Sequence, residues 1–384
     1  MIDYQAIEDQ YALPLFPKRG ITLVKGKNAH LWDDKGNKYI DCMAGQGVVS
    51  IGHCNDKVAK AVAEQAQQLI TCTGSFYSDQ RAQLIKKLAD ITPNNLNKVF
   101  LCNSGAESVE AAIKFARLST GKTELICAMR SFHGRTMGAL SATFNPKYRN
   151  PFKPLIPGFN FVPYNNFEKL EEKVTDKTAA IMLEVVQGEG GVHIGDAEFF
   201  KKVSQLCKEK NILFIVDEVQ TGFCRTGKMF ASEHFDLQPD ILCLAKAMAG
   251  GLPIGAVLCS DKIQVSFGSH GTTFGGNPLV AAAANAAIDF MIEVNLADQA
   301  FDKGKYFAEK FSKIELEKVR EIRQIGLMIG IELKEKVQPY ITELQEKGVL
   351  AIPAGATVLR LLPPLTISKE DLDIVTEKIA EVIS

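Results

Sequence analysis

The chain has 384 residues and a near-even charge balance, with 44 Lys and Arg against 45 Asp and Glu. Its hydrophobic content of 46% is enough to bury a large core and argues against a disordered chain. Bulk nucleic-acid binding is not expected, because it relies on an excess of basic residues. The length predicts two or three domains, or one large domain with a smaller one beside it.

Nothing in the sequence predicts a membrane span, a secretory signal or a metal site. The richest apolar stretch, residues 279–292, is interrupted by Asn285 and Asp289 and is shorter than the roughly 20 residues of a membrane helix. The acidic start, MIDYQAIEDQ, lacks the basic and apolar regions of a signal peptide. The nine cysteines form no C-x-x-C pair, and no histidine joins them at zinc-ligand spacing. We therefore expect a cytoplasmic protein with reduced cysteines and no metal.

The first 45 or so residues are predicted to contain a β-hairpin. In HLWDDKGNKYID, residues 30–41, a polar turn at 34–37 separates two runs suited to strands. The middle of the chain then alternates apolar runs with helical stretches such as 196–210, and several of the runs lack polar alternation. Strands covered on both faces have this pattern, so we expect an α/β domain with a largely parallel sheet. The predicted strands are 99–104, 124–129, 179–186, 212–219, 240–246 and 255–260.

The segment NSGAES, residues 103–108, follows the first of these strands and begins a helix. Free backbone N–H groups and the positive end of the helix dipole make such a turn an anion site, suited to a phosphate. Taken alone, the segment is more often an ordinary turn in which Asn103 or Ser104 caps the helix.

Two further strands deliver charged residues at their carboxyl ends, where open α/β sheets bind ligands. Asp217 ends an apolar strand and would need a cationic partner or a metal, or it could simply cap the next turn. Glu218 is expected to point away from it if the strand persists. Lys246 ends the next strand, before a run of small residues. Desolvation there would favour a neutral amine able to form an imine, whereas most lysines extend to solvent.

The glycine-rich HGTTFGGNP, residues 270–278, supplies the hydroxyls of Thr272 and Thr273 and could add another phosphate contact, or be only a turn. One ligand would use all four segments. Pyridoxal 5′-phosphate needs a lysine for its aldehyde, an acid for its pyridine nitrogen, and N–H and hydroxyl groups for its phosphate.

From about residue 300 the pattern changes to that of an α+β domain. A helix is followed by VREIRQIGLMIGIEL, a helix over 339–347, the runs VLAIPAG and VLRLLPPL, and a last helix that begins after Ser368. We expect the N-terminal hairpin to join this smaller domain.

With these residues in view, the chain resembles the class-III aminotransferases, pyridoxal-phosphate enzymes of fold-type I, from end to end. Within that family it is most similar to the acetylornithine aminotransferase group. Among these it resembles the enzymes that act on ornithine or lysine precursors attached to the amino-group carrier protein LysW. The matching segments are NSGAE (103–107), FHGRTMGAL (132–140), EVVQGEGG (184–191), DEVQTGFCRTG (217–227), LAKAMAGGLPIGA (244–256) and HGTTFGGNP (270–278).

The resemblance implies a large domain over 46–295 with a mainly parallel seven-stranded sheet. Residues 1–45 would join a small α+β domain over 296–384. It also implies a homodimer with active sites at the subunit interface. Three positions depart from the family pattern without touching a carrier of chemistry: Ser108-Val109, Val185 after Glu184, and Phe223-Cys224 before Arg-Thr-Gly.

By the same resemblance, Lys246 would hold the cofactor aldehyde and move the proton, and Asp217 would pair with the pyridine nitrogen. Phe132 would stack on the ring and Gln220 would bind its phenolic oxygen. The phosphate would be held by backbone N–H groups of the same chain and by one hydroxyl of the neighbouring subunit. The implied cofactor contacts are Gly105, Ala106, Phe132, Asp217, Gln220, Lys246 and Thr273. His133 is expected to be a packing or supporting residue.

The implied substrate contacts are Arg135, Thr272, Arg360 and Glu189. Arg360 would take the α-carboxylate of glutamate or 2-oxoglutarate, and Glu189 would neutralise it when a terminal amine enters instead. The alternative for Arg360, a solvent-facing strand residue, does not suit the apolar run VLRLLPP.

The resemblance therefore implies an aminotransferase that exchanges a terminal amine between glutamate/2-oxoglutarate and an N-blocked ornithine or lysine semialdehyde, in lysine or arginine biosynthesis. An acidic carrier protein could bind basic residues at the pocket mouth, and Lys147, Arg149 and Lys153 are candidates. Enzymes acting only on free acetylornithine, 4-aminobutyrate aminotransferases, aminomutases and a non-catalytic cofactor-binding regulator stay open as alternatives. A nucleotide hydrolase is not expected, because Met229 follows Gly222-x-x-x-x-Gly227-Lys228 where a Ser or Thr is needed.

Overall fold

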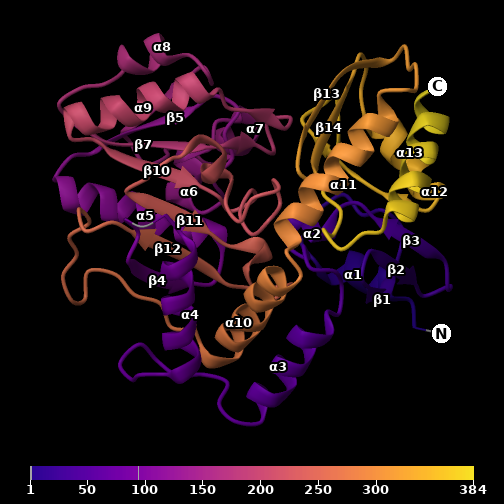
Figure 1. Ribbon diagram of the computed structural model, residues 1–384, viewed down its shortest axis with the longest axis horizontal. Coiled ribbons are helices and arrows are strands. Elements are labelled where there is room, and N and C mark those ends of the chain that lie inside the picture. The colour runs from indigo at the N-terminus through magenta and orange to yellow at the C-terminus, as the bar shows by residue number, and fades with distance from the viewer. Residues whose placement is uncertain (1, 94) are drawn as a thin grey trace.

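A seven-stranded sheet forms the core of the larger lobe in the computed structural model, which describes residues 2–93 and 95–384 (Figure 1). Only β12 runs antiparallel to its neighbours, so the sheet is mainly parallel, as predicted. In spatial order the strands are β4 (Lys98–Cys102), β12 (Gly255–Cys259), β11 (Ile241–Leu244), β10 (Leu213–Asp217), β7 (Thr178–Glu184), β5 (Glu124–Ala128) and β6 (Phe159–Val162).

Helices cover both faces of this sheet, which explains why its strands read as unbroken apolar runs. Successive residues of β10 enter different apolar clusters: Ile215 belongs to the cluster that includes Val109 of α5, and Val216 belongs to the cluster that includes Phe200 of α9. The helices of this lobe are α3 (Asp56–Ala66), α4 (Asp79–Ile91), α5 (Gly105–Thr120), α6 (Met137–Ala142), α7 (Pro146–Arg149), α8 (Phe167–Glu171), α9 (Ala197–Lys210) and α10 (Pro278–Glu293). Short 3₁₀ turns and a two-stranded ribbon complete it: η1 (Asn150–Phe152), η2 (Ala231–Phe235), η3 (Lys246–Ala249), β8 (Val186–Gln187) and β9 (His193–Ile194).

The smaller lobe contains the α+β arrangement predicted for the C-terminal part. Its sheet has the order β13-β14-β17-β16 and packs against helices that include the last one, whose first turn is capped by Ser368 Oγ accepting from Asp371 N at 3.0 Å. The elements are α11 (Leu296–Phe311), β13 (Val319–Ile325), β14 (Met328–Leu333), α12 (Gln338–Glu346), β15 (Val349–Leu350), β16 (Ile352–Ala354), β17 (Val358–Leu361) and α13 (Lys369–Ile383).

The N-terminal strands lie against the C-terminal part of the chain, far away in sequence. The predicted hairpin is formed by β2 (His30–Asp33) and β3 (Lys38–Asp41). β3 also pairs in parallel with β15, so the two ends of the chain share one sheet (Figure 1). The remaining elements are α1 (Tyr4–Tyr11), β1 (Leu23–Lys27) and the short α2 (Ala44–Gly47). The domain limits at 45 and 295 stay a prediction.

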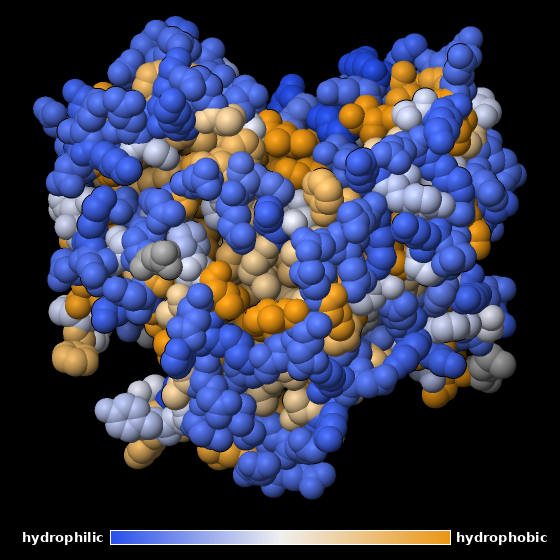
Figure 2. Space-filling model, in the orientation of Figure 1, coloured by the Kyte–Doolittle hydropathy of each residue, from blue (hydrophilic) through white to orange (hydrophobic). Residues whose placement is uncertain are grey.

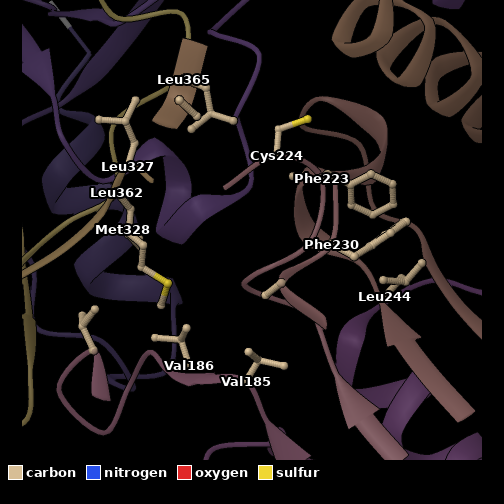
Figure 3. Close-up of a cluster of buried hydrophobic side chains, with 14 of the residues drawn as sticks. Val185, Val186, Phe223, Cys224, Phe230, Leu244, Leu327, Met328, Leu362 and Leu365 are labelled. Atoms are coloured by element: carbon tan, nitrogen blue, oxygen red, sulfur yellow. The ribbon is translucent and has the colours of Figure 1, made fainter. Parts of the chain in front are cut away.

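One buried cation joins the lobes. Arg225 is fully buried and donates to the carbonyl oxygens of Leu327 and Pro363 at 3.0 and 2.7 Å and to Ser50 Oγ at 3.0 Å. Figure 3 shows Phe223 and Phe230 of the larger lobe in the same apolar cluster as smaller-lobe side chains such as Leu327, Met328, Leu362 and Leu365. A single core therefore runs through both lobes.

Within the described part of the chain, no single helix has the length and apolar character needed to cross a membrane. α10 and α11 pass that test only as a pair, and they are bent by 63° at their junction. Most of α10 is buried inside the protein.

Candidate active site

A cavity of about 460 Å³ opens at the carboxyl ends of β7, β10 and β11, beside the beginning of α5. Lys246 and Asp217, which the sequence placed on separate strands, both line it. A larger hollow along α12 is lined mostly by exposed side chains such as Thr342 and Glu343, with no buried charged group. The polar side chains around the first cavity are Asn103, Ser104, His133, Arg135, Glu184, Glu189, Asp217, Gln220 and Lys246.

Lys246 begins η3, directly after β11, and its backbone has φ +45°. This left-handed conformation costs a residue with a Cβ about 1–2 kcal/mol, so the position does not favour stability. Burial lowers the pKa of the Lys246 ammonium below its ordinary value, although the nearby Glu189 carboxylate opposes the shift. A lysine held in this way supplies a neutral amine more readily than a surface lysine does.

Asp217 is the last residue of β10 and is held from two sides. Its Oδ1 accepts from the backbone N–H of Val219 at 2.9 Å, and its Oδ2 lies 2.7 Å from Nδ1 of the buried His133. Because a carboxylate only accepts, Nδ1 of His133 is the donor. Glu218 lies outside the cavity, as predicted, and accepts the backbone N–H groups of Ala231 and Ser232 at 2.7 Å.

Glu184 places a second carboxyl beside Asp217, because the two residues are register partners on β7 and β10. It is buried and accepts from the backbone N–H of Phe132 at 3.2 Å. Burial, and then the charge of Asp217, raise the pKa of the Glu184 carboxyl well above its usual range.

The beginning of α5 offers free hydrogen-bond donors to the cavity. Ser104 caps the helix by accepting from Glu107 N at 3.2 Å, whereas the N–H groups of Gly105 and Ala106 have no acceptor within the described chain. A Cβ at Gly105 would lie 2.5 Å from a methyl carbon of Val219, so only glycine allows this close approach.

Arg360 of β17 comes from the smaller lobe and contacts two residues that line the cavity, Glu189 and Gln220. Its side chain is 2% exposed, and it donates to Glu189 Oε1 at 2.6 Å and to Gln220 Oε1 at 3.1 Å. Burial raises the pKa of the Glu189 carboxyl, but the charges of Arg360 and Lys246 outweigh it, and the pKa falls below its ordinary value. The ion pair inferred from the resemblance is therefore present, while its role in binding stays a prediction.

Arg135 lies at the mouth of the cavity and is held through the face of its guanidinium group. Its Cζ is 3.5 Å from the ring centre of Tyr148 and 5.5 Å from that of Phe132. Phe132 itself lines the cavity and meets Tyr148 edge-on, with ring centres 6.0 Å apart.

Thr272 and Thr273 lie outside this cavity, in a neighbouring hollow of about 380 Å³ that also includes Phe274. Thr272 Oγ1 accepts from Asn103 Nδ2 at 3.2 Å, and Asn103 lines both hollows. Within one chain, neither threonine is grouped with Lys246. Their contacts with cofactor and substrate therefore stay a prediction.

Comparison with known proteins identifies the family of the chain. The model of the aminotransferase class-III family matches residues 16–383. The chain belongs to this family. Members of the family use pyridoxal 5′-phosphate, and the class-III chain described here is a transaminase of fold-type I.

Three relatives illustrate the likeness. The acetylornithine aminotransferase of Methanocaldococcus jannaschii is 46% identical over 98% of this chain and 97% of its own. The [LysW]-aminoadipate semialdehyde transaminase of Deinococcus radiodurans is 45% identical over 99% of this chain and 90% of its own. Among solved structures, the ornithine aminotransferase of Toxoplasma gondii superposes with a TM-score of 0.95 at 33% identity, covering 99% of this chain and 94% of its own.

The cavity of this class-III aminotransferase has the donor set that the cofactor needs. The cavity holds the amine of Lys246, whose pKa is lowered, and the buried carboxylate of Asp217. It also holds two free N–H groups at the beginning of α5, where a Cβ at Gly105 would clash with Val219. Lys246 would hold the aldehyde end, Asp217 the ring nitrogen, and Gly105 and Ala106 the phosphate.

Two features of the site were missed in the sequence. Glu184 was noted only because Val185 follows it, and Tyr148 was not singled out. Both act on their neighbours through contacts between residues far apart in sequence, Glu184 with Phe132 and Tyr148 with Arg135. An aromatic residue two positions after Pro146 was the only sequence signal for Tyr148.

Proposed function

We propose that this aminotransferase moves a terminal amino group between glutamate/2-oxoglutarate and an N-blocked ornithine or lysine semialdehyde. The observation that carries the proposal is the ion pair between Arg360 and Glu189, because Glu189 lines the same cavity as Lys246. Such a pair suits an enzyme that binds two kinds of substrate in turn. One kind carries a carboxylate beside its amine, and the other has no carboxylate there. The names of the relatives support the same pair of substrate classes.

Bound pyridoxal 5′-phosphate supplies an electron-withdrawing ring that stores the amino group between two half-reactions. The residues of the chain orient the substrate and move its proton. Lys246 Nζ, with its lowered pKa, can accept a proton from the substrate carbon and then donate it to the carbon that becomes protonated next. Asp217, fixed by His133 and Val219, presents a carboxylate to the ring nitrogen.

Arg360 and Glu189 would alternate between two states. When glutamate enters, its α-carboxylate competes for the guanidinium edge and Glu189 is displaced. When a terminal amine enters, no carboxylate is adjacent, and Glu189 keeps the buried Arg360 neutralised. An unpaired guanidinium that is only 2% exposed would otherwise be costly.

The segment around α7 supports a carrier-bound substrate. Lys147 and Lys153 are exposed, and Lys147 adjoins Tyr148, whose ring contacts Arg135 at the cavity mouth. Arg149 is less available, since its guanidinium lies 4.6 Å from the ring centre of Phe161. These lysines could attract an acidic carrier protein.

We also propose a homodimer. Large apolar side chains are exposed in two segments, one between α3 and α4 and the other carrying Thr272 and Thr273. Figure 2 shows apolar side chains projecting at the lower left of the molecule, where Figure 1 places these segments. A second copy would cover them and could bring Thr273 to the partner cavity. The exposed side chains are Leu69, Ile70, Phe76, Tyr77, Val265, Phe267 and Phe274.

The test is a survey of amine donors against the holoenzyme, read by mass spectrometry as conversion of the cofactor to its aminated form. Glutamate, free acetylornithine, carrier-linked ornithine or lysine and 4-aminobutyrate would be compared side by side. We expect glutamate and an N-blocked diamine to convert the cofactor fastest. Fastest conversion by 4-aminobutyrate would contradict the proposed substrate, and no conversion by any donor would favour a cofactor-binding regulator.

A further inference from the structure

Arg135 is held differently from Arg360, the other arginine of the site. No hydrogen bond or ion pair joins its guanidinium to residues 2–93 or 95–384. Its contacts are with ring faces, at 3.5 Å from the centre of Tyr148 and 5.5 Å from that of Phe132. Arg360, by contrast, is held through its N–H edge by Glu189 and Gln220.

A guanidinium stacked on an aromatic face keeps its N–H groups free in the plane of the stack. Those N–H groups form the fork that binds a carboxylate with two parallel hydrogen bonds. Arg135 lines the cavity. Its free edge is thus available to a carboxylate of a substrate bound in the cavity.

Tyr148 is itself fixed in place, although it does not line the cavity. It belongs to α7, which Asn145 caps by accepting from Lys147 N at 3.0 Å. The chain before α7 is tied back by a bond from Phe144 N to Ser131 O at 3.0 Å. The edge of one ring meets the face of the other between Tyr148 and Phe132, at an interplanar angle of 85°. The ring therefore forms a fixed platform for a long, flexible arginine.

We infer that Tyr148 is a positioning residue for substrate selection: its ring face orients Arg135 so that the guanidinium edge binds a carboxylate remote from the reacting amine. The ligand class is an aliphatic amine that carries a carboxylate at its far end. The inference deepens the proposed function and rests on Arg135 being a substrate contact. It does not depend on which blocking group or carrier the natural substrate bears.

The test uses two amines of equal length, 5-aminopentanoate and pentylamine, which differ by the carboxylate. The measurement is kcat/KM for conversion of the bound cofactor in the holoenzyme. We expect wild type to prefer the carboxylated amine by at least about 10-fold, as a hydrogen-bonded charge contributes. Tyr148→Leu should reduce that preference about 3- to 10-fold, through a higher KM for 5-aminopentanoate, and Tyr148→Phe should retain it because the ring face remains.

Two controls separate positioning from a general loss of stability. Tyr306→Leu removes a tyrosine whose ring lies 5.0 Å from Lys369 Nζ, in a similar contact outside the cavity, and should leave the preference unchanged. Arg135→Met should abolish the preference, and adding Tyr148→Leu to it should cause no further loss. Calorimetric titration of the holoenzyme with glutarate gives a second readout that does not need turnover, and Tyr148→Leu should weaken glutarate binding.

Several outcomes would overturn the inference. Equal losses for both amines in Tyr148→Leu would mean that the ring only supports the fold. Loss of the preference in Tyr148→Phe would assign the effect to the hydroxyl group. A wild-type enzyme that prefers neither amine would rule out the role of Arg135 itself. If the donor survey instead shows that the proposed blocked substrate is wrong, the preference for the carboxylated amine still tests Tyr148.

Discussion

At the scale of single residues, Lys246 is the position where function overrides stability. Its left-handed backbone and its buried ammonium are both unfavourable, and the nearby carboxylates of Glu189, Asp217 and Glu184 offset the cost of burial only in part. Such a combination is expected where a neutral amine is needed at a fixed point.

Lys246→Ala should reduce turnover by at least about 10⁴-fold, because the chain loses both its covalent anchor and its proton carrier. Turnover with glutamate and 2-oxoglutarate, followed by the absorbance of the bound cofactor, measures this. Lys303→Ala is the matched control, since burial also lowers the pKa of Lys303 but that residue lies outside the cavity. Turnover of Lys246→Ala within 10-fold of wild type would refute the assignment.

Arg360→Ala should reduce kcat/KM for glutamate by about 100-fold or more, as expected for loss of one partner of a buried charged pair. The terminal-amine substrate should lose much less, because it offers no α-carboxylate to this side chain. Arg360→Lys keeps the charge but cannot form two parallel hydrogen bonds, so its kcat/KM for glutamate should lie between those of wild type and Arg360→Ala. Half-reactions measured separately for each amine would decide, and equal losses would show that Arg360 does not discriminate.

The sequence located the residues that end a predicted strand or begin a predicted helix, but not those that act through a neighbour. Asp217 and Lys246 follow apolar runs, so their place at one sheet edge could be predicted. The pairing of Glu184 with Asp217 depends on strand order and register. The stacking of Tyr148 on Arg135 depends on how a loop folds back, which no periodicity encodes.

At the scale of elements, the beginning of α5 lies close to the segment that follows β10. The approach is so close that a Cβ added to Gly105 would lie only 2.5 Å from a methyl carbon of Val219. Val219 follows Asp217, which accepts its N–H. Val219 therefore links the beginning of the helix to Asp217, the predicted partner of the ring nitrogen.

Gly105→Ala should weaken binding of the cofactor roughly 10-fold, because overpacking at a close contact commonly costs about 1–3 kcal/mol. Titration of the apoenzyme with pyridoxal phosphate measures the effect. Adding Val219→Ala should restore part of the affinity by removing the clash. Gly121→Ala, at the other end of α5 with φ +68° and no neighbour within 4 Å, should lower thermal stability but leave cofactor affinity unchanged. Equal affinity losses in both glycine variants would contradict this explanation.

Six of the seven sheet strands could be recognised as apolar runs, and the exception is instructive. β6 is an edge strand of only four residues, FNFV, and three of them are partly exposed. This run is too short, and its mixture of apolar and polar residues too irregular, to be recognised from the sequence as a buried strand. The antiparallel direction of β12 was equally hidden, because a strand covered on both faces reads the same in either direction.

At the scale of the whole molecule, the position of Thr273 outside its own cavity leads to a test of the dimer. Thr273→Ala alone should lower cofactor affinity about 10-fold or more, as a lost bond to a charged group does. Coexpression of Thr273→Ala chains with Lys246→Ala chains should then restore activity. In a mixed dimer, the Lys246→Ala chain can supply Thr273 to the intact Lys246 of its partner. No gain over Thr273→Ala alone would assign Thr273 to its own chain or to no site.

The guanidinium of Arg225 has a consequence for the order in which the chain assembles. Its acceptors come from Ser50, Leu327 and Pro363, so the early, middle and late parts of the polypeptide must meet before this cation can leave water. We expect its dehydration to be a late event in folding. A fragment of residues 1–295 would keep Arg225 but lose both of its carbonyl acceptors. We therefore expect this fragment not to fold as an independent domain.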